Sequence, residues 1–259
     1  PLELQRVYAR LHFDDEARRF LESCRPSCLL STLARLLTCF LSVTDTNGLL
    51  GRGQMHVLSA EQCRRLLPLA AQTPGSALLD VGAGDGNVTS KLAPLFGTVV
   101  TTEVSGPMCR RLRQKGYTCF QTASIGPSVL PKSGCYDVVS ILNVLDRCDK
   151  PRQLLSDAKR LMKAETGRLL LAVVLPFSEF VESGSRRLPP SEPLNMAGAR
   201  CGDGVSFEES LMVLTHNVLT PLGFVVETVA RVPYLCRGDM RHPFYVLYDA
   251  ILVLSNKSA

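Results

Sequence analysis

Three glycines follow one another at alternate positions in the stretch "LLDVGAGDGNVT", which runs from Leu78 to Thr89. Gly82, Gly84 and Gly86 come after an apolar run typical of a buried strand and before a segment with a helical pattern. Glycines at such a turn give the backbone freedom and let it approach a ligand closely. Two ligands fit a turn of this kind: the pyrophosphate of a dinucleotide, and the cationic methyl donor S-adenosyl-L-methionine.

The acidic residues around the glycines favour the second ligand. A dinucleotide fingerprint has the spacing G-x-G-x-x-G, whereas the spacing here is G-x-G-x-G with Asp80 before the first glycine and Asp85 inside the loop. Two carboxylates would repel a pyrophosphate and suit a sulfonium and an ammonium group. Glu103 ends the next apolar run, where a carboxylate can accept both ribose hydroxyls of either ligand. We therefore expect S-adenosyl-L-methionine, with S-adenosyl-L-homocysteine as the product. A plain tight turn and a nicotinamide oxidoreductase are the alternatives.

A second group of polar residues lies in "LNVLDRC", where another apolar run ends at Asn143 and Asp146. Polar pairs at the end of a strand often serve as turn or cap residues. Here they would emerge at the edge of the sheet where the methyl donor meets its acceptor. We therefore treat Asn143 and Asp146 as candidate functional residues.

The elements that must position these residues alternate between strand and helix. Five strands are expected within 76–82, 97–105, 117–122, 136–142 and 167–177, and helices within 87–96, 107–116 and 151–162. This alternation predicts a parallel, doubly wound α/β sheet. The loops at the carboxyl ends of its strands meet at one edge, which is where ligands bind in such sheets.

The end of the chain departs from the alternation. Residues 178–205 are polar and rich in Pro, Gly and Ser, which indicates an insertion loop, and a helix is expected over 206–219. Two strands, 223–235 and 244–255, then follow with no helix between them and predict an antiparallel hairpin. Five parallel strands and a terminal hairpin predict the seven-stranded, Rossmann-like sheet of class I methyltransferases.

The N-terminal part is expected to add helices to this domain. Residues 1 to about 43 have helical patterns, Thr44 to Met55 is expected to be a glycine-rich loop, and Ser59 with Gln62 forms a capping-box pattern that opens a helix. We expect an extension over 1–60 that packs on a single methyltransferase domain over 61–259. The apolar segment 28–43 indicates a core-facing helix, with a peripheral membrane helix as the alternative.

Composition narrows the class of protein. The 259 residues are 46% hydrophobic, carry a net charge of +5 and include no Trp. No apolar run is long enough to span a membrane, and the charge lacks the basic stripe with aromatics typical of nucleic-acid binding. The ten cysteines include no CxxC pair, so we expect no metal site and mostly buried thiols. A disulfide between Cys24 and Cys28 stays open.

Motifs along most of the chain resemble one family, the DREV-type methyltransferase-like proteins, which are protein-histidine N-pros methyltransferases. The matching segments are "TDTNGLLGRGQM", "LLDVGAGDGNVT", "LNVLDRCD", "LAVVLPF", "RVPYLCRGDM" and "FYVLYDA". The resemblance implies methylation of the Nδ1 atom of histidine in His-x-His motifs with small x, giving pi-methylhistidine. It further implies substrates that include histidine-rich transporters and other zinc-binding proteins, and a location in the endoplasmic reticulum or mitochondrion.

The resemblance also implies roles for individual residues. Glu103, Asn143 and Tyr234 are expected to contact the cofactor, beside Asp80, Asp85 and the three glycines. Asp146 and Tyr245 are expected on the substrate side as catalytic residues. The insertion 178–205 does not follow the family pattern, which leaves the peptide preference open. A methyltransferase for another acceptor and a binding module without activity are the alternatives.

Overall fold

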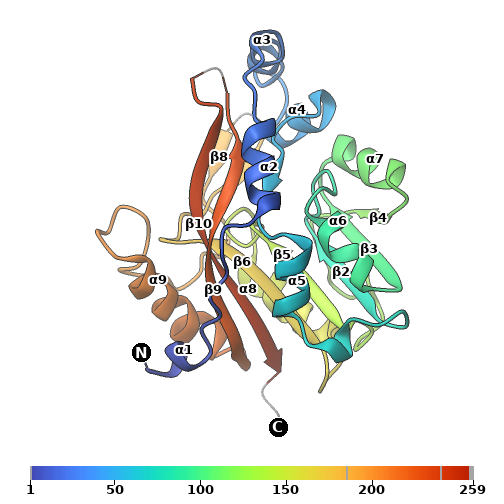
Figure 1. Ribbon diagram of the computed structural model, residues 1–259, viewed down its shortest axis with the longest axis vertical. Coiled ribbons are helices and arrows are strands. Elements are labelled where there is room, and N and C mark those ends of the chain that lie inside the picture. The colour runs from blue at the N-terminus through green and yellow to red at the C-terminus, as the bar shows by residue number, and fades with distance from the viewer. Residues whose placement is uncertain (1, 185, 240, 257–259) are drawn as a thin grey trace.

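An eight-stranded curled sheet forms the centre of the computed structural model, which describes residues 2–184, 186–239 and 241–256 (Figure 1). The strands lie in the order β1-β9-β10-β6-β5-β2-β3-β4. Their bounds are β1 Met55–His56, β2 Ala77–Val81, β3 Thr98–Glu103, β4 Thr118–Gln121, β5 Val138–Leu142, β6 Arg168–Val174, β9 Phe224–Arg237 and β10 Phe244–Asn256.

The pairing of the strands confirms the predicted fold class. Strands β6, β5, β2, β3 and β4 are parallel neighbours. Strand β10 is antiparallel to β6, and β9 is antiparallel to β10. The five parallel strands and the terminal hairpin are those expected from the sequence, and β1 adds an eighth strand at the edge beside β9.

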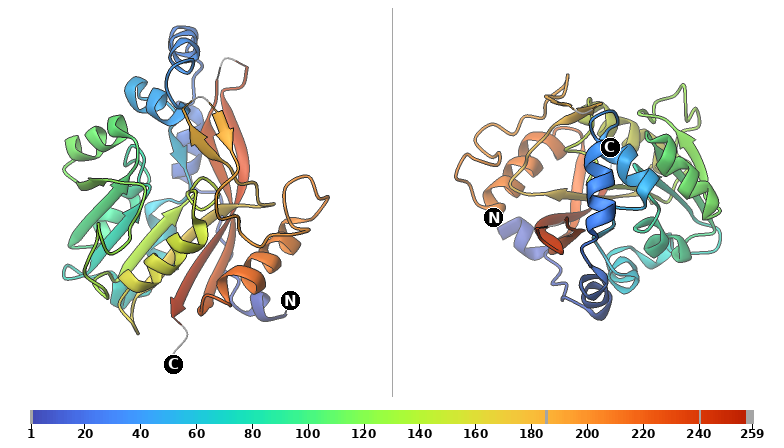
Figure 2. Two further views of the ribbon diagram at one scale, coloured as in Figure 1. Left: turned by 180° about the vertical axis from the view of Figure 1, so that it is seen from behind. Right: turned by 90° about the horizontal axis from the view of Figure 1, so that it is seen from above.

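Helices cover both faces of the sheet, so that the domain has three layers (Figure 2). On one face, α8 (Pro151–Leu161), α9 (Phe207–Val213) and the π-helical turn η3 (Leu214–Leu219) enclose a large apolar core. On the other, α5 (Ala60–Leu66), the short turns η1 (Leu69–Ala71) and η2 (Ala93–Leu95), and α6 (Thr89–Leu92) enclose a second core. Alternate residues of the inner strands supply the two cores: in β5, Val139 faces the first and Val138 the second.

Five further helices complete the fold. They are α1 (Leu2–Arg6), α2 (Asp15–Ser23), α3 (Cys28–Leu37), α4 (Val43–Leu50) and α7 (Gly106–Gln114). The expectation of a loop over Thr44 to Met55 was wrong for most of that segment. Ser42 accepts from the Asp45 N–H and begins α4, while Gly51 in the left-handed conformation ends it. The segment's Gly, Thr and Asn content, which suggested a loop, concealed these two cap signals.

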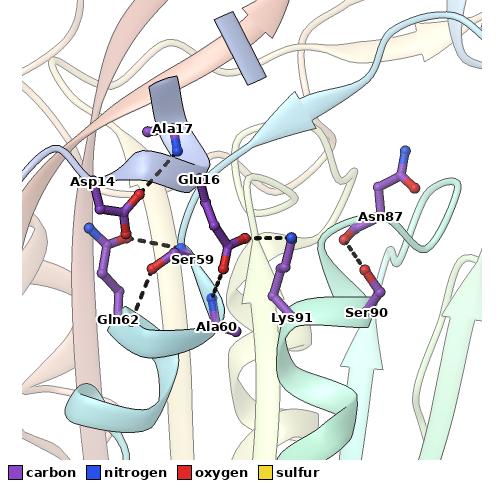
Figure 3. A network of polar contacts seen from close by, with 9 residues as sticks. All are labelled: Asp14, Glu16, Ala17, Ser59, Ala60, Gln62, Asn87, Ser90 and Lys91. Atoms are coloured by element: carbon purple, nitrogen blue, oxygen red, sulfur yellow. Dashed lines mark hydrogen bonds and ion pairs between the residues drawn. The ribbon is translucent and has the colours of Figure 1, made fainter. Parts of the chain in front are cut away.

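A network of polar contacts fastens the N-terminal segment to the second face of the sheet (Figure 3). Asp14 accepts from the Ala17 N–H and so caps α2. Glu16, two residues further on, accepts from the Ala60 N–H and pairs with Lys91 of α6. Lys91 follows the glycine-rich loop, so these contacts connect the N-terminal helices to the element that carries that loop.

The insertion 178–205 contains a small hairpin of two antiparallel strands, β7 (Val181–Ser183) and β8 (Arg186–Leu188). The Thr44 hydroxyl donates to Glu182 at 3.0 Å, which joins this hairpin to α4. Within the described residues, no helix has the length and hydropathy to cross a membrane. All ten cysteines are free thiols, including Cys24 and Cys28.

Candidate active site

The loop after β2 lies at the carboxyl edge of the parallel strands, the upper edge of the sheet in Figure 1. The Gly82 and Ala83 N–H groups donate to the Thr102 carbonyl at 2.8 and 3.1 Å. The loop therefore folds across the end of β3, beside Glu103. Because β5 is also parallel to β2, Asn143 and Asp146 follow at the same edge.

Two of the loop glycines are required for different reasons. Gly82 has φ +67°, and a Cβ there would lie 2.5 Å from Val144 Cγ2, so Gly82 lets the loop pack against the segment after β5. Gly84 has φ +57°, yet a Cβ there would meet no atom within 4 Å. The backbone at Gly84 is thus exposed to open space, as a surface that receives a ligand must be.

Glu103 holds this loop in place. Its Oε2 accepts from the Gly84 N–H at 2.9 Å, and its Oε1 accepts from the Val104 and Ser105 N–H groups at 2.8 and 2.9 Å. Burial raises the pKa of the Glu103 carboxyl, while these backbone bonds oppose the rise. The carboxylate is therefore fixed at the end of β3, where the sequence placed a ribose acceptor.

The two aspartates next to the glycines, Asp80 near the end of β2 and Asp85 in the loop, are engaged with protein groups. Asp80 is buried and accepts from the Thr89 and Ser140 hydroxyls at 2.6 and 2.7 Å. Burial raises its pKa to about 6. Asp80 therefore ties β2 to β5 and to the helix after the loop. Asp85 accepts from the backbone and side-chain N–H groups of Asn87, and so shapes the turn.

Asn143 reaches across the sheet to a residue that the sequence analysis did not single out. Its Nδ2 donates to Oδ2 of Asp249, on β10, at 2.7 Å. Asp249 is fully buried, and burial raises its pKa to about 8. Asn143 is also the one described non-glycine residue with positive φ, at +57°, a conformation that Asn tolerates better than most residues.

Asp146 lies close to this pair. It is 3% exposed, and its Oδ2 pairs with the Arg147 guanidinium at 2.8 Å. Burial raises the pKa of Asp146, whereas Arg147 opposes the rise. Arg147 also lies over the Phe180 ring at 4.0 Å, and the Phe180 N–H donates to the Asp146 carbonyl. The start of the insertion therefore packs directly on Asp146.

Three buried oxygen atoms in this cluster have no hydrogen-bond partner within the part of the chain that the structure describes: Asn143 Oδ1, Asp146 Oδ1 and Asp249 Oδ1. A buried polar atom without a partner costs on the order of 1–3 kcal/mol. All three are acceptors, and two belong to carboxyl groups. The cluster therefore fits a ligand that brings N–H donors and positive charge.

The structure places the two tyrosines differently. Tyr234 is 7% exposed on β9, where its hydroxyl contacts the Met55 sulfur. Burial raises the pKa of Tyr234 well above its usual value, and the neighbouring Cys236, Asp249 and Asp146 raise it further. Tyr234 lies two residues after Val232, the strand partner of Asp249, and therefore on the same face of the sheet as Asp249. Tyr245 is 41% exposed near the tip of the β9–β10 hairpin and donates to Asp239. Tyr245 and Asp249 lie on the same face of β10, four residues and therefore about 13 Å apart along the strand. The role of Tyr245 on the substrate side stays a prediction.

Asp249 and Arg147 are the residues that sequence reasoning missed. A signal for Asp249 was present, because a lone carboxylate interrupts the apolar strand "FYVLYDAILVLS". A charged residue at a core position of a strand is either an error or functional. No comparable signal in the sequence marks Arg147. Its contacts with Ser178 and Phe180, at the start of the insertion, are apparent only from the fold.

These observations fit S-adenosyl-L-methionine. Gly84 leaves room for a ligand beside Glu103, and the buried acceptors match the positive charges of that cofactor. A pyrophosphate would instead bring further negative charge to Asp80, Asp85 and Glu103. In the protein, the cofactor would supply the methyl group, and the chain would hold and orient it.

Solved methyltransferase structures have similarity to this chain at low sequence identity. One from Bacillus halodurans is 15% identical with a TM-score of 0.49, over 77% of this chain and 99% of that chain. The trans-methyltransferase CalH, in complex with SAH, is 17% identical with a TM-score of 0.42, over 71% of this chain and 52% of that chain. A Haloferax volcanii complex of the Trm112 methyltransferase activator and a methyltransferase is 19% identical with a TM-score of 0.38, over 44% and 51%. The chain spans about half the length of the last two.

The family comparison covers nearly the whole chain. The model of the DREV methyltransferases matches residues 1–256, which includes the glycine-rich loop, the buried cluster and both strands of the terminal hairpin. The protein is therefore a class I methyltransferase that uses S-adenosyl-L-methionine, and the chain belongs to the DREV methyltransferase family.

Proposed function

We propose that the protein transfers the methyl group of S-adenosyl-L-methionine to Nδ1 of a histidine ring in His-x-His sequences, where x is small. The observation that carries the proposal is the free oxygen of Asp146. Its Oδ2 is paired with Arg147, while its Oδ1 is buried and has no partner among the described residues, at the edge of the sheet where we expect the cofactor. A neutral imidazole offers that oxygen one ring N–H and keeps a lone pair on its other nitrogen.

Asp146 would select the nitrogen that attacks. If its Oδ1 accepts from Nε2–H, the tautomer with a free lone pair on Nδ1 is held in place. No strong base is needed, because the unperturbed pKa of histidine is about 6.5 and the neutral ring is already a nucleophile. The harder task is alignment, with Nδ1 about 3–3.5 Å from the methyl carbon before reaction.

The transfer is balanced without a further reactant. The Nδ1–methyl bond forms as the sulfur–methyl bond breaks, and the electron pair of that bond stays on sulfur as S-adenosyl-L-homocysteine. The ring becomes an imidazolium, whose charge the Asp146 carboxylate that accepts from it stabilises. The Nε2 proton then leaves through Asp146 to solvent, which gives neutral pi-methylhistidine. Tyr245 would position the ring or the second histidine.

The substrates would be proteins or peptides with His-x-His, among them histidine-rich zinc-binding proteins and transporters. Histidine binds metals through a ring nitrogen, so a methyl group on Nδ1 would block one of the two possible ligands. We propose a location in the endoplasmic reticulum or mitochondrion, where substrates of this kind would be met. Fractionation of cells that express the tagged full-length protein tests that location.

The experiment uses purified protein, labelled S-adenosyl-L-methionine and two peptides, one with repeated His-Ala-His and one with those histidines replaced by alanine. Chromatography of the hydrolysed peptides separates the two methylhistidine isomers. We expect label only in the first peptide and only as the N-pros isomer. Label in the N-tele isomer would contradict the role of Asp146. No label, with cofactor binding intact, would overturn the histidine acceptor and favour another one.

A further inference from the structure

Asp249 occupies a position where a charged residue is costly. It lies in the inner strand β10, opposite Val174 on β6 and Val232 on β9, and it is fully buried. The residues that follow it, Ala250 to Leu254, are apolar and buried. Among the described residues, no Lys or Arg forms an ion pair with Asp249. Removing such a carboxylate from water is unfavourable unless something compensates for it, and strand pairing gives no reason for it.

The side-chain hydrogen bond between Asp249 and Asn143 fixes the orientation of an amide. The amide nitrogen of Asn143 faces Asp249 and donates to its Oδ2 at 2.7 Å. The carbonyl oxygen of Asn143 must then point the other way. That oxygen, Asn143 Oδ1, is buried and accepts no hydrogen bond from any described residue.

The backbone of Asn143 is held as well. Its N–H donates to the Ala172 carbonyl on β6 at 2.9 Å, and its φ is +57°. The position directly follows β5, beside Val144, which the glycine-rich loop contacts at Gly82. Backbone and side chain together therefore present one acceptor toward the cofactor loop.

We propose that Asp249 is a positioning residue that orients the amide of Asn143, so that the Asn143 carbonyl oxygen accepts a hydrogen bond from the α-ammonium group of S-adenosyl-L-methionine. Asp249 thereby recognises the amino-acid end of the cofactor without contacting it. The inference rests on the cofactor and on the expected role of Asn143 in binding it. It does not depend on histidine as the acceptor.

The rival explanation is that the Asn143–Asp249 bond only joins β10 to the end of β5. Both explanations predict a loss of stability when Asp249 is replaced, so stability alone cannot separate them. They differ in which part of the cofactor loses affinity. A positioning role affects ligands that carry the amino-acid end, whereas a structural role affects every ligand of the site.

The test is calorimetry on the full chain with two ligands, S-adenosyl-L-homocysteine and 5′-methylthioadenosine, which keeps the adenosine and sulfur but lacks the amino-acid end. We expect Asp249→Ala to weaken binding of the first roughly tenfold to a hundredfold, the range of a hydrogen bond to a charged group. Binding of methylthioadenosine should stay within about twofold of the parent, since it makes no contact that Asp249 orients.

Further variants keep the outcome decisive. Asn143→Ala should show the same ligand selectivity, and the double variant should lose no more than either single variant, because the two side chains act as a unit. Asp249→Asn preserves the shape and serves if the alanine variant does not fold. Asp137→Asn is the matched control, since Asp137 is a buried carboxylate next to the other end of β5, where it accepts from the Ala77 N–H.

Neither reading of the calorimetry depends on a methyl acceptor, so the result stands whether or not the peptides are methylated. Equal losses for both ligands, an unchanged affinity for S-adenosyl-L-homocysteine, or additive losses in the double variant would each overturn the proposal. A selective and non-additive loss, absent from Asp137→Asn, would support it.

Discussion

Gly82→Ala and Gly84→Ala should separate the stability of the cofactor loop from its binding function. Both residues have positive φ, which costs a residue with a Cβ roughly 1–2 kcal/mol. At Gly82 the new Cβ would also lie 2.5 Å from Val144 Cγ2, and overpacking of this kind costs about 1–3 kcal/mol. We therefore expect a loss of about 2–5 kcal/mol at Gly82.

Gly84→Ala should behave differently because nothing lies within 4 Å of its added Cβ. The stability loss should be limited to the backbone cost of about 1–2 kcal/mol, or roughly 2–8 °C in Tm. The affinity for S-adenosyl-L-homocysteine should fall roughly tenfold or more, since the Cβ projects into the space that the ligand fills.

Thermal unfolding without ligand and calorimetry with S-adenosyl-L-homocysteine measure the two effects separately. Val144→Ala supplies the control, because it removes the atoms that Gly82→Ala would contact. The pair should be less destabilised than the sum of the single variants. Parent-like affinity in Gly84→Ala would refute the placement of the cofactor on this loop. A Gly82→Ala protein as stable as the parent would refute the packing argument.

Three further predictions concern the charged groups. Asp146→Asn should slow methyl transfer at least tenfold while cofactor affinity stays within about threefold, and single-turnover assays that show unchanged rates would refute its role. Folding raises the pKa of Asp249 from 3.8 to about 8, so the folded state binds that proton more tightly. The contribution of this group to the free energy of unfolding is largest below about pH 4 and is lost as the pH rises toward 8. Urea unfolding without cofactor should therefore show Asp249→Asn gaining stability over the parent across that range, whereas a pH-independent difference would contradict the raised pKa. Glu16→Ala removes the bonds to Ala60 and Lys91. We expect the free energy of unfolding to fall by about 1 kcal/mol and the N-terminal segment to be proteolysed faster. Unchanged proteolysis would count against the anchoring role of this contact.

Much of the fold followed from local patterns in the sequence. The alternation of apolar strands and amphipathic helices predicted the five parallel strands, and the absence of a helix between the last two predicted the hairpin. The capping box at Ser59 and Gln62 is present as predicted. These features could be predicted because each depends on neighbours only a few residues away.

The segment over Thr44 to Met55 shows where composition misleads. Its helix α4 is short and is capped by Ser42 and Gly51. Strand β1 has two residues, which pair with β9 about 180 residues later in the chain. Composition indicated a loop, whereas the helix is stabilised by its two caps and the strand by pairing with a distant partner. Propensity alone does not register either of these contributions.

The candidate site was predicted where its residues follow strand ends and missed where they come from a distant strand. Gly82 directly follows β2, Glu103 is the last residue of β3, and Asn143 directly follows β5. Because these strands are parallel, the three residues are expected at the same edge of the sheet. The partner of Asn143 is Asp249, 106 residues away. That contact depends on β10 lying next to β6, and on a register that local sequence does not fix.

The most direct test of the account is a crystal structure of the protein with S-adenosyl-L-homocysteine and a His-Ala-His peptide. The account predicts the cofactor along Gly84 and Glu103, with its ammonium on Asn143 Oδ1. It also predicts one histidine ring with Nε2 within hydrogen-bond distance of Asp146 Oδ1 and Nδ1 facing the cofactor sulfur. A ring bound through Nδ1, or a peptide away from Asp146, would contradict the central claim.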